Sequence, residues 1–380
     1  MTASGASTYQ WSKNGTPISG ATQASYYSPA ITAANAGDVY AVTIGNANGN
    51  TLSNNASISI NPNTDGSPPA SFWGDGTIPT AQQVMTVKFV NATNGKYPDS
   101  QVFWGFNGKT ADGTSISELH AFSDAPTYDM PAVSSARMYF YIASSASATG
   151  TGSTNYYDFI EFNIGRSSSS QPWGFNGDTT RVDAFGLKTA IHLHCADGTD
   201  RIRGEDYGTF LEDRAITFQK YLAEVPSAFA ATATQNAPYR IVEPGAAGFG
   251  ANGANATYFN SYIDTVWANN NIDTSIIPKP TPFLDFVSNQ YPDLTAALER
   301  HVADKPGTFN ADGTLVDPSF WSKQPSSSFY ASGPANFYAR YWHTHGIAGL
   351  AYGFPYDDVG SYSSDIACSS PQYLVVAIGW

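Results

Sequence analysis

Two acidic residues, Glu161 and Asp183, occur where the side-chain pattern predicts a sheet with one exposed face. Residues 158–164 alternate so that every second side chain faces a core and Glu161 points away from it. A region with a serine run and Pro-Trp and Asn-Gly turn signals follows, and residues 181–185 then alternate again, as a returning antiparallel strand would. The pattern predicts that the carboxylates of Glu161 and Asp183 share one face.

Paired carboxylates on a rigid sheet, with aromatic side chains nearby, are suited to glycoside hydrolysis. One carboxyl group protonates the leaving oxygen, and the other acts as a base or nucleophile at the anomeric carbon. The alternative is that Glu161 and Asp183 are ordinary solvated residues, because most exposed acids have no catalytic role. The pattern alone does not decide between the two.

Three strings carry a resemblance to a known family: DFIEFNI, TTRVDAFG and FPYDDV. Together they resemble glycoside hydrolase family 64, the laminaripentaose-producing β-1,3-glucanases of thaumatin-like architecture, and the resemblance covers residues 71–380. It implies an inverting mechanism with Glu161 as general acid and Asp183 as general base. It also implies a two-part body with a wide cleft, and sugar contacts by Asn163 and Thr180.

Three further residues are candidates for substrate binding. Trp173 lies in the loop between the two predicted carboxylate strands, where its indole either stacks on a sugar ring or anchors the loop in the protein. The acidic pair Asp357 and Asp358 either caps a turn or lines the cleft and binds sugar hydroxyls. Both alternatives remain open for each.

Two His-x-His pairs, His192 with His194 and His343 with His345, would each place two imidazoles on one face of a strand. A catalytic zinc needs three convergent protein ligands and a water. The sequence does not show that the two pairs meet, and the family pattern requires no metal. We therefore expect no metal and no cofactor.

Composition indicates a secreted, β-rich protein. Charged residues make up only 13% of the 380, and the net charge of −13 argues against nucleic acid as a partner and suits a neutral glucan. The chain has no run of about 18 apolar residues, so we expect no transmembrane helix and no membrane partner. No leader begins this sequence, and its absence from the chain does not require its absence from the gene. We expect a monomer.

The only two cysteines, Cys195 and Cys368, lie far apart in sequence, each in or next to a predicted strand. In a secreted protein they are candidates for a disulfide. Two buried free thiols are the alternative.

Residues 1–60 predict short strands and resemble part of an immunoglobulin-like β-sandwich. Trp11 matches the core tryptophan of strand C, residues 38–40 match the tyrosine corner, and Val42 replaces the second cysteine. Too few residues precede Trp11 to supply the first strands, so we expect that the chain begins inside this domain. Residues 61–70 have the composition of a linker.

Residues 71–380 predict the catalytic module, which is mainly β with an α/β insertion. Apolar runs separated by Asn94-Gly95, Asn107-Gly108 and Asp112-Gly113 predict hairpins of an antiparallel β-barrel or sandwich at 71–199. A helical period begins at 206–229, with Thr209 as expected N-cap, and returns at 258–267 and 292–302. We assign 200–330 to a mixed α/β subdomain, and 331–380 to closing strands that include 339–359 and 373–380.

Two functions from different classes remain. The first is an endo-acting β-1,3-glucan hydrolase that releases medium-length oligosaccharides from laminarin or fungal-wall glucan by inversion. The second is a non-catalytic thaumatin-like β-glucan-binding protein, because fold does not dictate function. Convergence of Glu161 and Asp183 at an open groove favours the enzyme, whereas burial of either one in a salt bridge favours the binding protein.

Overall fold

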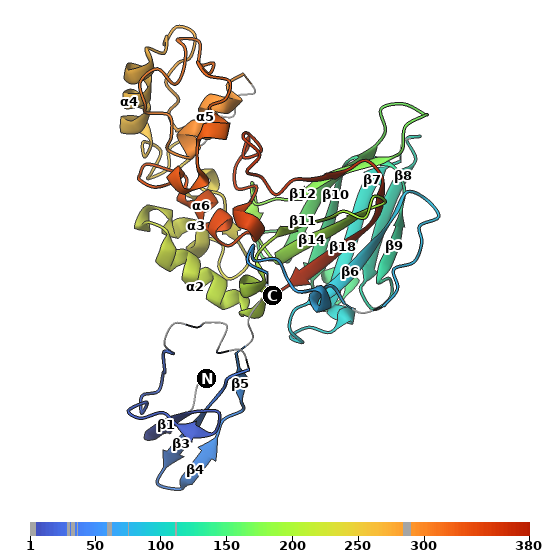
Figure 1. Cartoon of the computed structure of the whole chain (residues 1–380), viewed down its shortest axis with the longest axis vertical. Helices are drawn as coiled ribbons and strands as arrows, with labels where there is room; N and C mark the ends of the chain where they lie inside the picture. Colours follow the sequence, from blue (N-terminus) through green and yellow to red (C-terminus); the bar gives the residue numbers. More distant parts are fainter. Residues whose placement is uncertain are drawn as a thin grey trace. The chain divides into compact units, whose positions relative to one another are not determined.

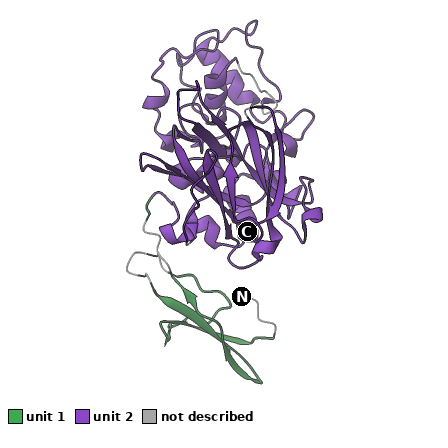
Figure 2. Ribbon diagram, turned by 90° about the vertical axis from the view of Figure 1, so that its right-hand side faces the viewer, with its two compact units in different colours: residues 1–64 green, residues 65–380 purple. Residues whose placement is uncertain are grey.

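The structure is a computed structural model that describes residues 5–28, 31, 35, 37–58, 63–74, 76–110, 112–283 and 290–380. The chain forms two compact units, residues 1–64 and 65–380 (Figure 2). Part of the predicted linker, residues 61–62, lies outside the described residues. Each unit is treated below by itself.

The first unit contains one five-stranded sheet among its described residues. Its strand order is β2-β1-β3-β4, and β5 also pairs with β3. Trp11 is half-buried opposite Val42 and donates its indole N–H to the carbonyl oxygen of Gln23 at 2.9 Å. A second packed sheet is not among the described residues, so the immunoglobulin-like assignment stays a prediction. The strands are β1 Thr8–Lys13, β2 Thr16–Pro17, β3 Val39–Asn46, β4 Gly49–Leu52 and β5 Ala56–Ser57.

The second unit is built on two open sheets (Figure 1). The six-stranded sheet has the order β17-β12-β11-β10-β7-β8, and the five-stranded sheet has the order β15-β14-β18-β6-β9. Every pairing in them is antiparallel except β18 with β6. The strands are β6 Met85–Ala92, β7 Val102–Lys109, β8 Ser115–Ala121, β9 Thr127–Met130, β10 Val133–Ile142, β11 Tyr156–Gly165, β12 Gly174–Thr179, β14 Lys188–Cys195, β15 Asp200–Gly204, β17 Ile366–Cys368 and β18 Pro371–Gly379.

Neither sheet closes on itself within the described residues, so the expectation of a closed barrel is wrong and the sandwich alternative describes the strands. The main apolar core takes alternate residues from both sheets, such as Met138, Phe162 and Leu193. This alternation is the period-two pattern expected of strands with one buried face.

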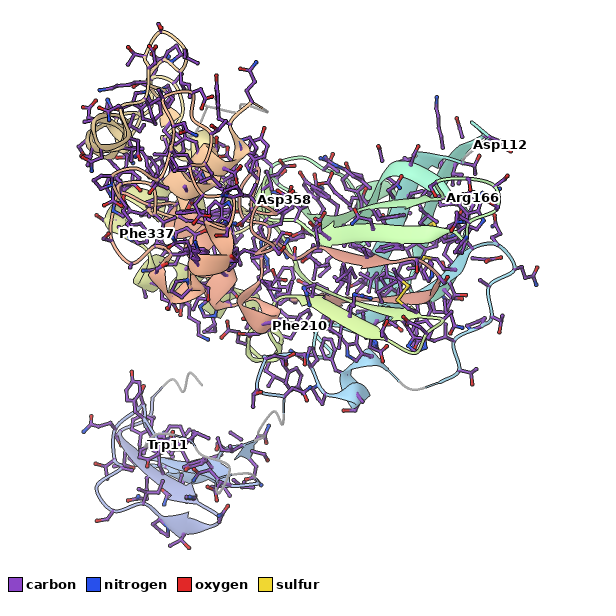
Figure 3. All side chains as sticks on the ribbon, turned by 45° about the horizontal axis from the view of Figure 1, so that its top comes forward. Trp11, Asp112, Arg166, Phe210, Phe337 and Asp358 are labelled. Atoms are coloured by element: carbon purple, nitrogen blue, oxygen red, sulfur yellow. A yellow bond between two sulfur atoms is a disulfide. The ribbon has the colours of Figure 1, made fainter. Side chains whose placement is uncertain are left out.

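The disulfide between Cys195 and Cys368 is present, with the two Cα atoms 6.2 Å apart (Figure 3). Cys195 ends β14 of the five-stranded sheet, and Cys368 ends β17 of the six-stranded sheet. The predicted bond is therefore confirmed, and it links the two layers of the sandwich.

Six α-helices lie in the second unit among the described residues, and none of them is long and apolar enough to cross a bilayer. Asp206 and Asp213 cap α1 and α2 by accepting the backbone N–H groups of Thr209 and Ala215. The expectation of Thr209 as N-cap is wrong, because Thr209 lies inside the first turn. The helices are α1 Tyr207–Leu211, α2 Arg214–Glu224, α3 Ala230–Thr234, α4 Asn260–Asn270, α5 Pro292–Glu299 and α6 Phe337–Thr344.

Short elements complete the unit. β13 and β16 pair with each other and belong to neither large sheet. Two more apolar cores lie among the helices, one around Trp342 and one around Trp267. The elements are β13 Ala184–Phe185, β16 Ile241–Val242, and the 3₁₀ turns η2 Ala70–Trp73, η3 Asp99–Gln101, η4 Ala146–Ala148, η5 Ser227–Phe229, η6 Gly245–Ala247, η8 Trp321–Lys323, η9 Ser326–Ser328 and η10 Ile347–Gly349.

The prediction of a strand over 339–359 is wrong, because this segment contains α6 and a series of turns. Buried aromatic side chains at 337, 338, 341 and 342 lie on one helical face, and Asn336 caps the helix by accepting the N–H of Ala339. Aromatic residues favour strands, but packing against the core around Trp342 decides the local structure here.

Two of the three turn signals are turns. Asp112-Gly113 joins β7 to β8, and Asn94-Gly95 turns after β6 with positive φ at both residues. Asn107-Gly108, by contrast, lies inside β7.

Candidate active site

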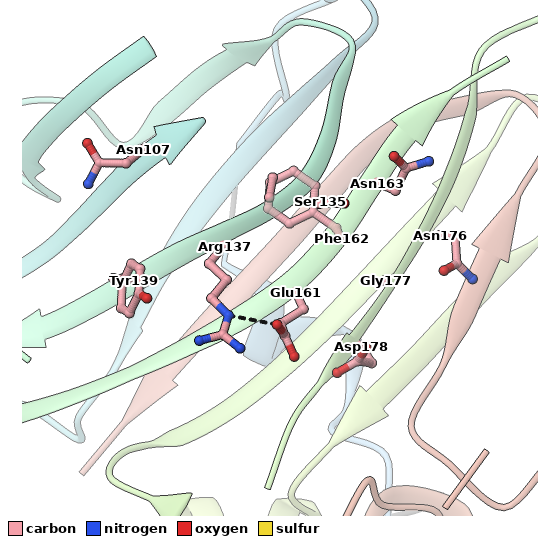
Figure 4. Close-up of a pocket in the computed structure, with 11 residues that line it drawn as sticks. Asn107, Ser135, Arg137, Tyr139, Glu161, Phe162, Asn163, Asn176, Gly177 and Asp178 are labelled. Atoms are coloured by element: carbon pink, nitrogen blue, oxygen red, sulfur yellow. Dashed lines mark hydrogen bonds and ion pairs between the residues drawn. The ribbon is translucent and has the colours of Figure 1, made fainter. Parts of the chain in front are cut away.

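A polar row crosses the outer face of the six-stranded sheet. Asn107 on β7 is the Cα partner of Arg137 on β10, Arg137 is the partner of Glu161 on β11, and Glu161 is the partner of Asp178 on β12. The row lies in an open pocket of about 590 Å³ (Figure 4). The pocket is lined by Asn107, Ser135, Ala136, Arg137, Tyr139, Glu161, Phe162, Asn163, Asn176, Gly177 and Asp178.

Glu161 leaves the core face, as its place in the alternation predicts. Its carboxylate accepts a hydrogen bond from Nε of Arg137 at 2.7 Å, and its side chain remains 36% exposed. The guanidinium of Arg137 also lies 4.5 Å from the ring centre of Phe159. Glu161 is thus ion-paired and open to the pocket rather than buried in a salt bridge.

Asp178 is the acidic neighbour of Glu161 across the strand pair. It is only 9% exposed, and its Oδ1 has no hydrogen-bond partner among the described residues. Burial, reinforced by the negative charges of Asp365 and Glu161, raises the pKa of Asp178 to about 8. Two like charges directly opposite each other on neighbouring strands are unfavourable. Near neutral pH, Asp178 therefore holds a proton.

Asp183 does not lie on the strand beside Glu161, so the predicted returning strand at 181–185 is wrong. The strand that pairs with β11 is β12, which ends at Thr179. The chain then turns, and β13 pairs with β16 instead. Asp183 is 57% exposed, and its carboxylate reaches the same guanidinium as Glu161, with 4.0 Å between Oδ2 and Nη1 of Arg137.

The other predicted contact residues divide between pocket and interior. Asn163 is exposed in the pocket opposite Asn176, its partner on β12. Trp173 is half-buried at the end of the serine-rich loop, and Arg166 stacks 4.2 Å from its ring centre. Thr180 is 2% exposed, and its hydroxyl accepts the N–H of Val182. In this conformation Thr180 is not available to a sugar, and that expectation is corrected.

The acidic pair at 357–358 separates in the same way. Asp357 is fully buried and binds the guanidinium of Arg300 at 2.9 Å, the ring of His343 at 2.9 Å and the N–H of Gly353 at 2.8 Å. It therefore holds a turn and contacts no sugar in this conformation, which favours the first alternative for it. Asp358 is exposed, on the segment between the helices and the six-stranded sheet (Figure 3).

The two histidine pairs bind different partners. His192 and His194 lie on one face of β14 and both contact Oδ1 of Asp200, at 2.7 and 2.8 Å. His343 and His345 lie at the end of α6 rather than on a strand, and His345 contacts Glu224. Across the described part of the chain, no three acidic, histidine or cysteine side chains are grouped as metal ligands.

Sequence reasoning missed Asp178 and Arg137. Asp178 follows Asn176-Gly177, which reads as a turn signal, and Arg137 lies in a run dominated by apolar residues. The available signal was the same alternation that identified Glu161. Phe175 and Thr179 are buried on β12, and the positions between them, Asn176 and Asp178, face the pocket.

Comparison with protein families decides the identity. The model of the β-1,3-glucanases, glycoside hydrolase family 64, matches residues 54–283 and 278–378. The chain belongs to this family. It is a glycoside hydrolase of the endo-β-1,3-glucanase type, which favours the enzyme over the non-catalytic binding protein.

Solved structures of family 64 share the fold. The laminaripentaose-producing β-1,3-glucanase from Paenibacillus barengoltzii is 25% identical, with a TM-score of 0.65 over 100% of this chain and 95% of that one. The same enzyme complexed with laminarihexaose is 26% identical, with a TM-score of 0.63 and the same coverage. A β-1,3-glucanase domain from Clostridium beijerinckii, at 22% identity and a TM-score of 0.64 over 80% of this chain and 100% of that one, supports the fold alone. A search of curated proteins found no match.

Proposed function

We propose that this family 64 enzyme cleaves internal bonds of linear β-1,3-glucan by inversion and releases medium-length laminari-oligosaccharides. Glu161 is the general acid, and Asp178 replaces Asp183 as the general base. The observation that carries the proposal is the pair of facing carboxyl groups in an open pocket, one buried and one exposed.

An inverting glycosidase needs one protonated carboxyl group and one carboxylate at the same time. Glu161 and Asp178 meet this requirement together, because the raised pKa of Asp178 leaves one proton on the pair near neutral pH. Adjacent carboxyl groups titrate as a unit, so the single proton belongs to the pair, and the mechanism requires it on Glu161 in the complex with the sugar. The exposed Glu161 then reaches the leaving oxygen, and the deprotonated Asp178 activates a water.

The pocket suits a neutral, hydroxyl-rich chain. Amide side chains of Asn107, Asn163 and Asn176 line it and offer both donors and acceptors to sugar hydroxyls. The relative from Paenibacillus barengoltzii is described as a laminaripentaose-producing enzyme, and one of its structures is a complex with laminarihexaose. These descriptions support a product of similar length here. We also propose that the protein acts outside the cell, in keeping with its disulfide, and as a monomer, which sedimentation would test.

The test compares three variants on a linear β-1,3-glucan: Glu161→Gln, Asp178→Asn and Asp183→Asn. We expect the first two to lower kcat by roughly 10²–10⁴ with little change in glucan binding, because each keeps its size and loses proton exchange. Asp183→Asn should lose far less. Near-wild-type turnover by Glu161→Gln or Asp178→Asn would refute the assignment.

Two measurements separate the finer claims. Proton NMR of the first products should show the α-anomer, and a β-anomer would refute inversion. An aryl β-glucoside oligomer with an activated leaving group needs no general acid for departure of that group. Glu161→Gln should therefore regain turnover on this substrate, whereas Asp178→Asn should not. The opposite recovery would exchange the two roles.

A further inference from the structure

One guanidinium on the pocket floor contacts both carboxylates that the sequence singled out. Nε of Arg137 lies 2.7 Å from Oε1 of Glu161, and Nη1 lies 4.0 Å from Oδ2 of Asp183. The ring of Phe159, 4.5 Å from the guanidinium carbon, supports the group from the sheet. All three charged side chains are partly exposed, at 44%, 36% and 57% respectively.

These contacts fix the orientation of Glu161. A glutamate has three side-chain torsions, and a partly exposed one samples several rotamers unless a partner holds it. The guanidinium is planar and donates hydrogen bonds in fixed directions, so its orientation determines the orientation of the carboxylate that it binds. Phe159 and Asp183 also contact the guanidinium. A displacement of about 1 Å in a reacting group can cost roughly 10² in rate.

We propose that Arg137 is a positioning residue for the acid–base pair, and that Asp183 acts on the reaction only through Arg137. The inference rests on the proposed function, because it takes Glu161 and Asp178 as that pair. It gives Asp183 a role other than general base, as the second anchor of the arginine.

The charge of Arg137 has a further consequence for the pair. A cation beside a carboxylate favours its ionised form. The charge of Arg137 therefore opposes the rise in the pKa of Asp178. The titratable and charged groups that face the pair from the neighbouring segments are Arg137, Tyr139, Asp183, Tyr352, Asp358 and Asp365. Arg137 is the only cation among these six.

The test uses Arg137→Met, Arg137→Lys, Asp183→Asn and the double variant Arg137→Met/Asp183→Asn in the full chain. For Arg137→Met we expect a fall in kcat of about 10–100-fold, with KM changed less than about threefold. Both limbs of its pH–rate profile should move to higher pH by about half a unit or more, because both carboxyls lose the nearby cation. Arg137→Lys should keep both limbs of the pH–rate profile at their wild-type positions, because it keeps the charge. It should not keep the full kcat, because lysine lacks the planar fork.

Asp183→Asn should lower kcat by about threefold or less in the wild-type background and have no further effect in the Arg137→Met background. Lys323→Met is the matched control, because it breaks another exposed ion pair, the one with Asp317 in the helical part. This control should leave kcat and the pH profile as they are in the wild type.

Two outcomes overturn the inference. Unchanged limbs in Arg137→Met would show that the arginine supports only the fold, and a full loss by Asp183→Asn in both backgrounds would make Asp183 the base. Failure of the proposed function looks different, since Glu161→Gln would then retain turnover whatever Arg137 does.

Discussion

Asp178 should lower the stability of the protein at alkaline pH, and replacing it should remove this loss. Its pKa is about 8 in the folded protein against an ordinary value of 3.8. Because the folded value is the higher one, the folded protein holds a proton that the unfolded chain has released between these pH values. The contribution of this group is therefore fully present below about pH 4 and is lost as the pH rises through about 8.

The size of the effect follows from the two pKa values. Their difference, at 1.36 kcal/mol per unit, gives an upper limit of about 6 kcal/mol for the free energy of unfolding. Relaxation of the pocket reduces this, and we expect Asp178→Asn to gain about 2–4 kcal/mol over the wild type at pH 9. At pH 4.5 the two proteins should differ by less than about 1 kcal/mol, since Asp178 is then protonated in the folded protein.

Scanning calorimetry at both pH values would measure the difference in the melting temperature of the larger unit. Carboxyl groups that do not interact with Asp178 titrate alike in both proteins, so the comparison measures Asp178 together with its coupling to Glu161 and Asp365. Asp183→Asn is the control, because its exposed carboxylate should change stability by no more than about 0.5 kcal/mol at either pH. If the difference in melting temperature between Asp178→Asn and the wild type is the same at both pH values, Asp178 is ionised in the folded protein. The proposal that the acidic pair shares one proton would then be refuted.

Two further predictions concern stability away from the pocket. Asp357→Asn should lower the free energy of unfolding by about 3–5 kcal/mol, because it leaves Arg300 buried without its carboxylate. Asp358→Asn next to it should change the free energy of unfolding by no more than about 0.5 kcal/mol. Equal melting temperatures for the two variants would contradict this prediction. Replacing both Cys195 and Cys368 by serine should lower the free energy of unfolding, measured in urea, by up to about 5 kcal/mol, because the disulfide spans 173 residues. Two thiols titrating in denatured, unreduced wild-type protein would show that the disulfide does not form.

The strands that were predicted well have either one buried face or a continuous apolar run. β10 and β11 pack alternate residues into the main core, so their period is visible in the sequence. β18 is a continuous apolar run instead, because residues 374–379 are buried on both faces. α4 and α5 were likewise found from helical spacing. α6 was missed because its aromatic residues suggest a strand, and only the core around Trp342, formed by segments distant in sequence, makes this segment a helix.

For the site, one carboxylate of the proposed pair was predictable and its partner was not. Glu161 faces away from the core, and the alternation of residues within its own strand is enough to predict this. Its neighbour depends on which residue of the next strand lies opposite, and the loop at 166–173 leaves that register open. Asp183 was chosen because the strand after this loop was placed too late in the chain.

The register that brings Asp178 to Glu161 is fixed by packing on the other face of the same strands. Gly177 lies opposite Phe162, and a Cβ atom at this position would come within 2.8 Å of both Phe162 and the ring of Phe175. The stacked rings of these two phenylalanines therefore require glycine between them. A slip of one residue would place a side chain in that space and turn Asp178 toward the core. The apolar contacts that stabilise the sandwich thus also select the acidic partner of Glu161.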